Sequence, residues 1–311
     1  MKGKGFNVFY IDERPSNSTL FKTLLRAGLI GLLRNKIYQY YARAIEAITS
    51  DNIEHILIIN PEAIDSLIIE RLRNKYPAAQ VTIYMWDSLQ NKKLAHLLFD
   101  KVDQVFTFDS YDCKQSAIEL LPLFYAKKDA PELLAPEQES SLFFIGNIHS
   151  DRLNSIDKLD AGFVASGKRF YKLLYYPSKI LFLLAFLKNP RVIKKFYHDI
   201  ILKPVAYSRV VAMMANAECI LDLVHPKQTG LTMRTMETLG LRKKLITNNV
   251  NIRNYDFYNP ELHYVIDPDN LKINEVIKFI DSSPALSLHY QNIVESYSVD
   301  IWLDRLLGRK K

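Results

Sequence analysis

The sequence has only two cysteines among its 311 residues, Cys113 and Cys219, and they lie far apart in apolar surroundings. So few thiols exclude a disulfide-stapled scaffold and a cysteine-based metal site, and they are typical of a reducing compartment. His149, His225 and His263 also lack the spacing of metal ligands. We therefore expect a protein without disulfides, metal or other cofactor.

Long apolar runs are absent as well. The stretch best suited to a membrane span, Ile180–Leu187, is far shorter than the roughly 18 residues that a crossing needs, and the first apolar run is too short for a signal peptide. We therefore expect a cytoplasmic protein. Its net charge of +7 comes without a helix-turn-helix or an aromatic RNA-binding signature, which favours an anionic small molecule or lipid surface over nucleic acid as partner.

The sequence instead alternates short apolar runs with longer amphipathic ones. The short runs are rich in Val, Ile, Leu and aromatic residues, as in strands of a parallel sheet that is covered on both faces. The predicted strands are Val8–Ile11, Ile56–Ile59, Val81–Met85, Val105–Phe108, Leu142–Gly146, Cys219–Val224, Lys244–Thr247 and Tyr264–Ile266. The predicted helices of the first half are Leu20–Thr49, Ala63–Tyr76, Lys92–Asp100 and Cys113–Leu120.

The stretch Lys127–Ser141 interrupts this alternation with Pro, Glu, Ala and Ser, which indicates a linker between domains. We therefore predict an α/β protein with two Rossmann-like domains, residues 1–130 and 140–290. Open α/β sheets bind ligands beyond the carboxyl ends of their strands. Two such domains facing a central cleft would bind two substrates.

The segment Lys168–Lys203 differs from the rest because it holds nine Lys or Arg residues and a single acidic one, Asp199, among aromatic and aliphatic residues. One interpretation is a helical surface that contacts the inner membrane or a lipid-linked acceptor through this basic segment. The other is an ordinary helical surface with a solvated basic face.

The most informative stretch is the strand-loop-helix unit Cys219–Asn249. Its loop contains His225, Gln228, Thr229 and Gly230, and a helix is predicted to begin near Thr232. The N–H groups at a helix start are unsatisfied and partly positive, so Gly230 and Thr232 would let a phosphate approach closely. The alternative is a capped helix with no ligand.

Charged and amide side chains in the same unit favour nucleotide binding. Arg234 would neutralise phosphate charge on a leaving nucleotide, and Glu237 would bind a ribose or hold the arginine in place. Three residues apart on a helix, the two would equally form an exposed ion pair. Asn248 and Asn249 follow the next strand and would lie beside the nucleotide, or they simply form a turn.

Several segments resemble one family of bacterial proteins. HPKQTGLTMRTMETLG, KKLITNN and NYDFYNP are similar to glycosyltransferases of polysaccharide and lipopolysaccharide biosynthesis, including CgeB-like and capsular polysaccharide synthesis proteins. IYMWDSLQN, FDKVDQVFTFDSYDC, LPLFY, FFIG and YSVDIWLDRLLG fit the same pattern, so the resemblance covers most of the chain. It implies a GT-B fold whose C-terminal domain binds the donor and whose last helix, in 291–311, packs toward the N-terminal domain.

The resemblance also implies a function and a site. The protein would move a sugar from a nucleotide-activated donor to a growing surface glycan, as in lipopolysaccharide, O-antigen or capsule synthesis, without a metal. The loop and helix from His225 to Glu237 would bind the donor, together with Gly146 and Asn147. Arg152 would join them. The His-Pro pair in this loop resembles the pair of transferases that use CMP-activated acidic sugars, and nucleoside diphosphate sugars are the alternative donors.

An inverting transferase needs a carboxylate or His that takes the proton of the acceptor hydroxyl, whereas a retaining one needs mainly a pre-organised site for the leaving phosphate. For the inverting case the candidate bases lie in the first domain. Asp87 follows the predicted strand Val81–Met85 and is the preferred base, with Trp86 available to stack on a sugar ring. In the alternative interpretation Asp87 caps the next helix and Trp86 belongs to the core. Asp12 and Glu13 follow the first predicted strand and are the reserve candidates for the acceptor side.

Other functions fit the sequence less well. Asp267 and Asp269 imitate a metal-binding Asp-x-Asp motif, but Pro268 between them indicates a turn. The lack of G-x-G-x-x-G after the first predicted strand argues against a nucleotide-sugar epimerase or another dinucleotide enzyme. The lack of G-x-S-x-G argues against a hydrolase. A non-catalytic GT-B subunit of a polysaccharide assembly complex stays open.

Overall fold

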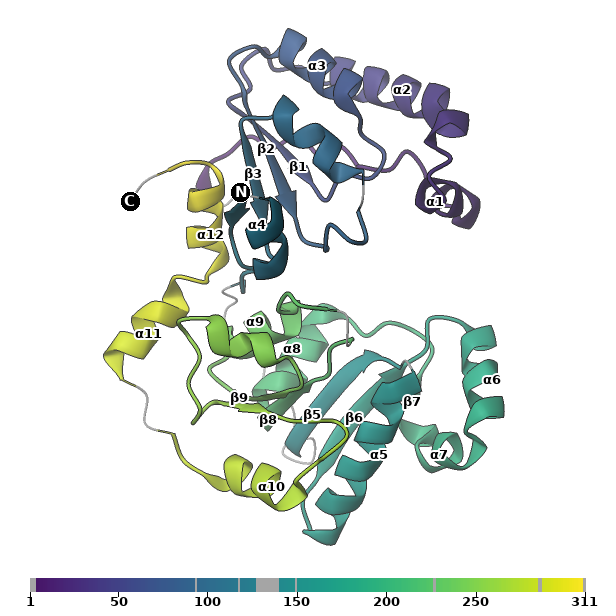
Figure 1. Ribbon diagram of the computed structural model, residues 1–311, viewed down its shortest axis with the longest axis vertical. Coiled ribbons are helices and arrows are strands. Elements are labelled where there is room, and N and C mark those ends of the chain that lie inside the picture. The colour runs from purple at the N-terminus through teal and green to yellow at the C-terminus, as the bar shows by residue number, and fades with distance from the viewer. Residues whose placement is uncertain are drawn as a thin grey trace. The chain divides into compact units, whose positions relative to one another are not determined.

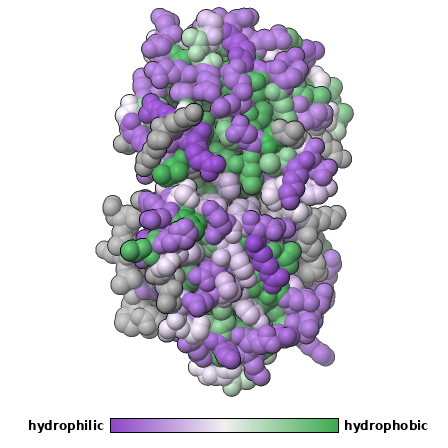
Figure 2. Space-filling model, turned by 60° about the vertical axis from the view of Figure 1, so that its left-hand side comes forward, coloured by the Kyte–Doolittle hydropathy of each residue, from purple (hydrophilic) through white to green (hydrophobic). Residues whose placement is uncertain are grey.

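The computed structural model describes residues 4–309 except 93, 117, 127–139, 149, 226–227 and 285–286. The chain forms two compact units: unit 1 comprises Met1–Leu123 and Trp302–Lys311, and unit 2 comprises Phe124–Ile301 (Figure 1). Most of the predicted linker Lys127–Ser141 lies outside the described residues. On the face shown in Figure 2, hydrophilic side chains dominate and apolar ones form smaller groups between them.

Unit 1 contains a four-stranded parallel sheet whose strands follow one another in chain order. The strands are β1 (His55–Ile59), β2 (Gln80–Met85), β3 (Gln104–Thr107) and β4 (Glu119–Leu120). The helices are α1 (Thr19–Arg26), α2 (Ile30–Glu46), α3 (Ser66–Lys75), the 3₁₀ helix η2 (Ala95–Lys101), α4 (Ser110–Ser116) and α12 (Val299–Leu306), whose Val299–Ile301 belong to unit 2.

The two faces of strand β2 show how the helices of unit 1 are distributed. Val81, Ile83 and Met85 pack into a core with α1, α2 and α3. Tyr84 has the opposite parity and lies on the other face. There its ring packs perpendicular to that of Trp302 in α12, with ring centroids 4.8 Å apart, and its hydroxyl donates to the carbonyl of Leu121 at 3.1 Å. The last helix therefore covers the second face of this sheet.

Unit 2 contains a six-stranded parallel sheet in the order β10-β9-β8-β5-β6-β7. The strands are β5 (Ser140–Asn147), β6 (Phe170–Tyr175), β7 (Ile200–Ile201), β8 (Ala217–Asp222), β9 (Lys244–Thr247) and β10 (His263–Val265). From β5 the chain adds β6 and then β7 on one side of the sheet. It then returns to place β8 on the other side of β5, and β9 and β10 follow outward from β8. This is the Rossmann strand order, with its switch point between β5 and β8.

Helices cover both faces of the unit 2 sheet (Figure 1). The helices of unit 2 are α5 (Ser150–Ala165), α6 (Lys179–Lys188), α7 (Pro190–Lys195), η4 (Tyr197–Asp199), α8 (Tyr207–Ala215), α9 (Met233–Gly240), η5 (Val250–Asn254), α10 (Ile273–Asp281) and α11 (Leu288–Glu295). Leu142 and Phe144 of β5 pack in one core with α5 and α10. Helices α8 and α9 contact β8 on the opposite face. No helix in the described part of the chain has both the length and the apolar character of a membrane span.

Most predicted strands are confirmed with ends shifted by one or two residues, but Val8–Ile11 is wrong. These residues form no strand, and Tyr10 is 85% exposed. The segment that follows is held against α2 instead, because the hydroxyls of Tyr40 and Tyr41 donate to the carbonyls of Asp12 and Glu13 at 2.9 and 2.7 Å.

Three predicted helical segments also need correction. The helix Leu20–Thr49 is divided into α1 and α2, with Gly28 between them at a φ of 74°. The helix Cys113–Leu120 begins and ends earlier, as α4, and Glu119–Leu120 pairs with β3 instead. The segment Lys168–Lys203 contains the strands β6 and β7 besides α6 and α7. Lys172 of β6 is buried, and its pairing with Asp160 at 2.7 Å allows a lysine inside this strand.

Candidate functional site

The site begins at the carboxyl ends of β5 and β8, on either side of the switch point in unit 2. Strand β5 ends with Gly146 and Asn147, which pair with Leu174 and Tyr175 of β6. A side chain at Gly146 would be crowded, since its Cβ would lie 3.1 Å from the ring of Phe144. Open α/β sheets bind ligands in the crevice that forms here.

Asp222, which the sequence analysis did not identify, closes strand β8 with a buried carboxylate. Its Oδ2 accepts hydrogen bonds from the hydroxyls of Thr232 at 2.5 Å and Thr235 at 2.9 Å. Burial raises the pKa of Asp222, while these hydrogen bonds and the charges of Arg234 and Arg152 oppose the rise. The carboxylate therefore fixes the start of α9 to the end of β8. An acidic residue within an apolar run was its only sequence signal.

Helix α9 begins where the sequence predicts, with Thr232 as its N-cap. The threonine side chain accepts from the backbone N–H of Thr235 at 3.2 Å. The N–H groups of Met233 and Arg234 precede the first hydrogen bonds within the helix. This helix end lies beside the switch point and is suited to an anion.

Arg234 and Glu237 form a pair with a separation of 2.8 Å between Nη1 and Oε2. Their side chains are only 21% and 11% exposed, so the pair is not the solvated surface contact of the alternative interpretation. Tyr207, which the sequence analysis also missed, opens α8 and donates to Glu237. Burial, followed by the charge of Glu237 and this hydrogen bond, raises the pKa of Tyr207 to about 12. Glu237 therefore orients the arginine.

Arg152 in α5 brings a second cation to the switch point. Its Nη1 donates to the carbonyl of Asn147 at 2.9 Å. Burial lowers the pKa of Arg152, and the charge of Asp222 opposes this change. Its Nε is buried and has no hydrogen-bond partner within the described residues. A half-buried cation with an open donor is suited to a phosphate oxygen.

The loop between β8 and α9 is held by amide side chains. Asn248 binds both backbone groups of Val224, accepting from its N–H at 2.7 Å and donating to its carbonyl at 3.1 Å. Asn249 donates to the carbonyl of Gly230 at 3.1 Å, and so does Gln228 at 3.2 Å. Their contacts shape the loop.

Two further loop residues complete the predicted donor site. The carbonyl of Thr229 accepts from Asn251 at 3.0 Å. His225 is exposed, and Pro226 lies outside the described residues.

In unit 1, Trp86 and Asp87 follow strand β2 as predicted. Trp86 is 51% exposed, so its alternative placement in the core is wrong. Asp87 accepts from the N–H of Ser88 and from the side chain of Asn91, both at 2.9 Å, and so fixes the turn after the strand. Nearby, burial raises the pKa of Asp112, and the charges of Asp109 and Asp87 raise it further. Within the described residues, no group of acidic, His or Cys side chains has the arrangement of a metal site.

Asp12 and Glu13, the reserve candidates, do not follow a strand. The Glu13 carboxylate accepts from the backbone N–H groups of Glu62 at 2.6 Å, Ala63 and Ile64 at 3.3 Å. Burial raises the pKa of Glu13 despite these hydrogen bonds. Asp12 accepts from the N–H of Arg14 at 3.1 Å. Both carboxylates are thus bonded to the protein's own chain.

The structure therefore gathers most predicted donor residues in unit 2. Around the ends of β5, β8 and β9 lie Gly146, Asn147, Arg152, Gln228, Thr229, Gly230, Thr232, Arg234, Glu237 and Asn248. The other predicted residues, Asp12, Glu13, Trp86 and Asp87, belong to unit 1.

No protein-family model matches the sequence, and no curated protein matches it. Solved structures match in fold. An α,α-trehalose-phosphate synthase (UDP-forming) from Burkholderia xenovorans, in complex with glucose-6-phosphate, has a TM-score of 0.64 at 11% identity, with 91% of this chain and 78% of that chain covered. The lipopolysaccharide outer core galactosyltransferase WaaB, in its apo form, has a TM-score of 0.52 at 14% identity, with 88% and 78% covered.

A UDP-GlcNAc 2-epimerase from Methanocaldococcus jannaschii, in complex with UDP-GlcNAc and UDP, also matches, with a TM-score of 0.50 at 13% identity and coverage of 86% and 79%. At these identities the likeness concerns the fold alone. The resemblance to CgeB-like and capsular polysaccharide synthesis proteins stays a prediction. The predicted fold class is confirmed: the chain has a GT-B-type fold with two Rossmann-like α/β units.

Proposed function

We propose that the protein is a glycosyltransferase that moves a sugar from a nucleotide-activated donor to a bacterial surface glycan. The observation that carries this proposal is the group of cations at the unit 2 switch point. Arg152 has a buried Nε that finds no partner among the residues that the structure describes, and Arg234 is held by Glu237 at the start of α9. The solved structures of similar fold support it, since they include a lipopolysaccharide galactosyltransferase and a UDP-forming synthase.

In this proposal the donor phosphate binds between Arg152 and the first N–H groups of α9, with Arg234 beside it. During transfer the bond between the anomeric carbon and the phosphate oxygen breaks, and the acceptor oxygen forms the new bond. The departing nucleotide keeps the bonding electrons as negative charge. Two arginines and a helix start would stabilise that charge, which is the largest contribution a site of this type makes.

The acceptor proton needs a base, and Asp87 is the proposed one. It follows a strand end and stands beside the exposed Trp86, whose ring would stack on a sugar. Asp12 and Glu13, the reserve candidates, are less suited to this role, because their carboxylates accept hydrogen bonds from backbone N–H groups. Lipopolysaccharide, O-antigen or capsule glycans, free or lipid-linked, are the proposed acceptors.

A second candidate function is a non-catalytic subunit that keeps the fold and binds a glycan or nucleotide. One observation favours it: in unit 1 the Asp112 and Glu13 carboxylates are bonded to backbone N–H groups, and Asp87 itself supports a turn. Such a subunit would bind a nucleotide or glycan without turnover. Binding and transfer must therefore be measured separately.

The first test is a calorimetric and thermal-shift screen of the protein against UDP, GDP, dTDP, CMP and ADP. We expect one nucleotide to bind best, and Arg234→Gln to weaken that binding by about 10- to 100-fold through the loss of a charge-assisted contact. Arg305→Gln is the matched control, because Arg305 is exposed in unit 1 and its loss changes the net charge equally.

The screen also identifies the donor class. Preference for CMP would select activated acidic sugars, and preference for a diphosphate would select nucleoside diphosphate sugars. If the folded protein binds none of these nucleotides, the donor site is refuted. If it binds one but transfers no sugar from the corresponding donors, the non-catalytic function replaces the transferase.

A further inference from the structure

Helix α6 is attached to unit 2 by one face. Phe182, Ala185 and Phe186 are half-buried and pack against the core of this unit. These positions, spaced at i, i+3 and i+4, mark the inward face of the helix. The remaining positions therefore point away from the core.

The outward face of α6 is aliphatic. A helix on a protein surface normally carries polar side chains on its outward face, and contiguous exposed apolar side chains mark an interaction site. In α6 the only charged residues are Lys179 and Lys188, at the two ends. The exposed fractions on this face are Ile180 71%, Leu181 50%, Leu183 55%, Leu184 49% and Leu187 68%.

Cations lie at both ends of α6 and in the neighbouring α7. Lys179, Lys188, Arg191 and Lys194 are exposed, and in the described part of the chain none of the four forms an ion pair. Helices α6 and α7 contain no acidic residue. An apolar face with an unneutralised basic border is complementary to an anionic lipid surface, which offers phosphates above acyl chains.

The helices that carry these side chains are firmly held. Lys195 of α7 forms ion pairs with Asp157 at 2.7 Å and Asp160 at 2.9 Å in α5. Ile193 and Phe196 are buried in the core of unit 2. Lys195 is thus occupied within the protein, whereas its neighbour Lys194 is available to a partner. The exposed side chains of α6 thus lie next to a helix that is fixed to the core of unit 2.

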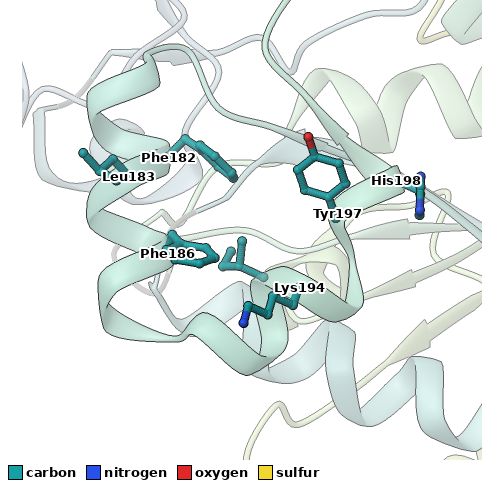
Figure 3. Close-up of a pocket in the computed structure, with 7 residues that line it drawn as sticks. Phe182, Leu183, Phe186, Lys194, Tyr197 and His198 are labelled. Atoms are coloured by element: carbon teal, nitrogen blue, oxygen red, sulfur yellow. The ribbon is translucent and has the colours of Figure 1, made fainter.

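A pocket between α6 and α7 adds to the apolar surface. It has a volume of about 470 Å³ and is lined by Phe182, Leu183, Phe186, Ile193, Lys194, Tyr197 and His198. Figure 3 shows the rings of Phe182 and Phe186 turned from α6 into this pocket, with Lys194 from α7 below them. The volume falls within the roughly 300–1,000 Å³ typical of ligand pockets, so an apolar chain fits beside a cation.

We propose that α6 and α7 bind the surface of an anionic phospholipid membrane. The aliphatic face of α6 lies among the upper acyl chains, while Lys179, Lys188, Arg191 and Lys194 contact lipid phosphates. The pocket between the helices accepts part of an acyl chain. Only this short part of the basic segment Lys168–Lys203 contacts lipid, since Lys172 and Lys195 are paired internally.

The test is cosedimentation of the full chain with vesicles of phosphatidylcholine alone and of phosphatidylcholine with phosphatidylglycerol. We expect binding to the anionic vesicles only, and weaker binding as salt is added. Leu184→Gln combined with Leu187→Gln should lower the partition coefficient by about tenfold or more. Lys188→Gln combined with Lys194→Gln should lower it by about thirtyfold.

Matched variants separate this surface from general effects. Leu288→Gln replaces a leucine that is 78% exposed on α11, and Lys158→Gln combined with Lys278→Gln removes two exposed charges elsewhere in unit 2. Both controls should bind vesicles like the unaltered protein, and all variants should unfold at similar temperatures. The vesicles contain no nucleotide or sugar, so the result does not depend on the donor site.

Two results would overturn the proposal. In the first, the unaltered protein stays in the supernatant with anionic vesicles, or the α6 variants sediment as strongly as their controls. In the second, sedimentation velocity shows a dimer that the double leucine variant dissociates, while no vesicles are bound. The α6 surface would then be an interface between two copies of this chain.

Discussion

In unit 2 the strands β5 and β8 lie on either side of a switch point, whereas the strands of unit 1 follow one another across the sheet in chain order. The first arrangement sends successive connections in opposite directions and leaves a crevice between them. The buried Asp222 and the half-buried Arg152 influence each other's charge there, and within the described residues the Nε of the arginine has no hydrogen-bond partner. In unit 1 the carboxylates of Glu13 and Asp112 accept from backbone N–H groups.

The difference shows that strand order, and not residue type, decides where a charged group is available to a ligand. Both units contain acidic residues, but in unit 1 the carboxylates of Glu13, Asp87 and Asp112 all accept hydrogen bonds from backbone N–H groups. Asp87 is the member of this group with an exposed aromatic neighbour, Trp86. We therefore expect unit 2 to supply binding and unit 1 to supply at most a single reactive carboxylate.

The largest expected effect follows from removing that carboxylate. Asp87→Asn keeps the acceptor oxygen of the turn, so the fold and nucleotide binding should be unchanged. If Asp87 is the base, sugar transfer should fall by about 10²- to 10⁴-fold, the usual contribution of a general base. Transfer rates and nucleotide affinity, measured on the same preparation, check this prediction.

Two outcomes would remove the proposed role of Asp87. An unchanged transfer rate shows that another group takes the proton. An equal loss of nucleotide affinity shows that the substitution disturbs more than the base.

The next effect concerns the buried charge of unit 2. Asp222→Ala should lower the free energy of unfolding by about 3–5 kcal/mol, because two threonine hydroxyls lose their acceptor and Arg152 loses its nearby negative charge. Urea unfolding followed by circular dichroism measures this loss. Asp222→Asn is the control, since it keeps an acceptor oxygen and should cost less. Equal losses for the two variants would show that the hydroxyl contacts contribute little.

Local patterns were enough to predict much of the fold. The strands β2 and β9 are short apolar runs, and Thr232 is a typical N-cap before a helix. Pairing between distant segments is not visible in such patterns. The apolar run Val8–Ile11 was predicted as a strand, although no neighbouring strand pairs with it. Strand β6 was missed because Lys172 interrupts its apolar run, and the burial of this lysine depends on ion pairs with Asp160 of α5 and Asp199.

The candidate site was also predictable only where its residues are close together in the sequence. The loop and helix after β8 were found because their residues are close in sequence. Asp222 was missed because its role depends on Thr232 and Thr235, which reach it only when α9 folds back onto β8. Tyr207 was missed for a similar reason, since its partner Glu237 lies on a different helix. Contacts between elements, which need the strand order, therefore separate a candidate residue from an assembled site.

The last prediction uses pH to distinguish the two units. His263 in β10 is buried, and burial lowers its pKa from 6.5 to about 4. Its Nδ1 accepts a hydrogen bond from the backbone N–H of Asn259 at 3.0 Å, which requires that nitrogen to be unprotonated. Between these two pH values the imidazole of His263 is protonated in the unfolded chain and neutral in the folded chain. Stability is therefore intact above pH 6.5 and should fall by about 3 kcal/mol as the pH drops to 4.

Unit 1 should respond in the opposite sense over this range. Burial raises the pKa values of Glu13 and Asp112, so their contribution to stability grows as the pH falls. Both tryptophans, Trp86 and Trp302, belong to unit 1, so their fluorescence reports that unit while circular dichroism reports both. At acidic pH the unfolding transition followed by tryptophan fluorescence should therefore differ from the one followed by circular dichroism. In His263→Asn the two transitions should coincide again. If they coincide in the unaltered protein at every pH, the units unfold as one and the titration of His263 does not distinguish them.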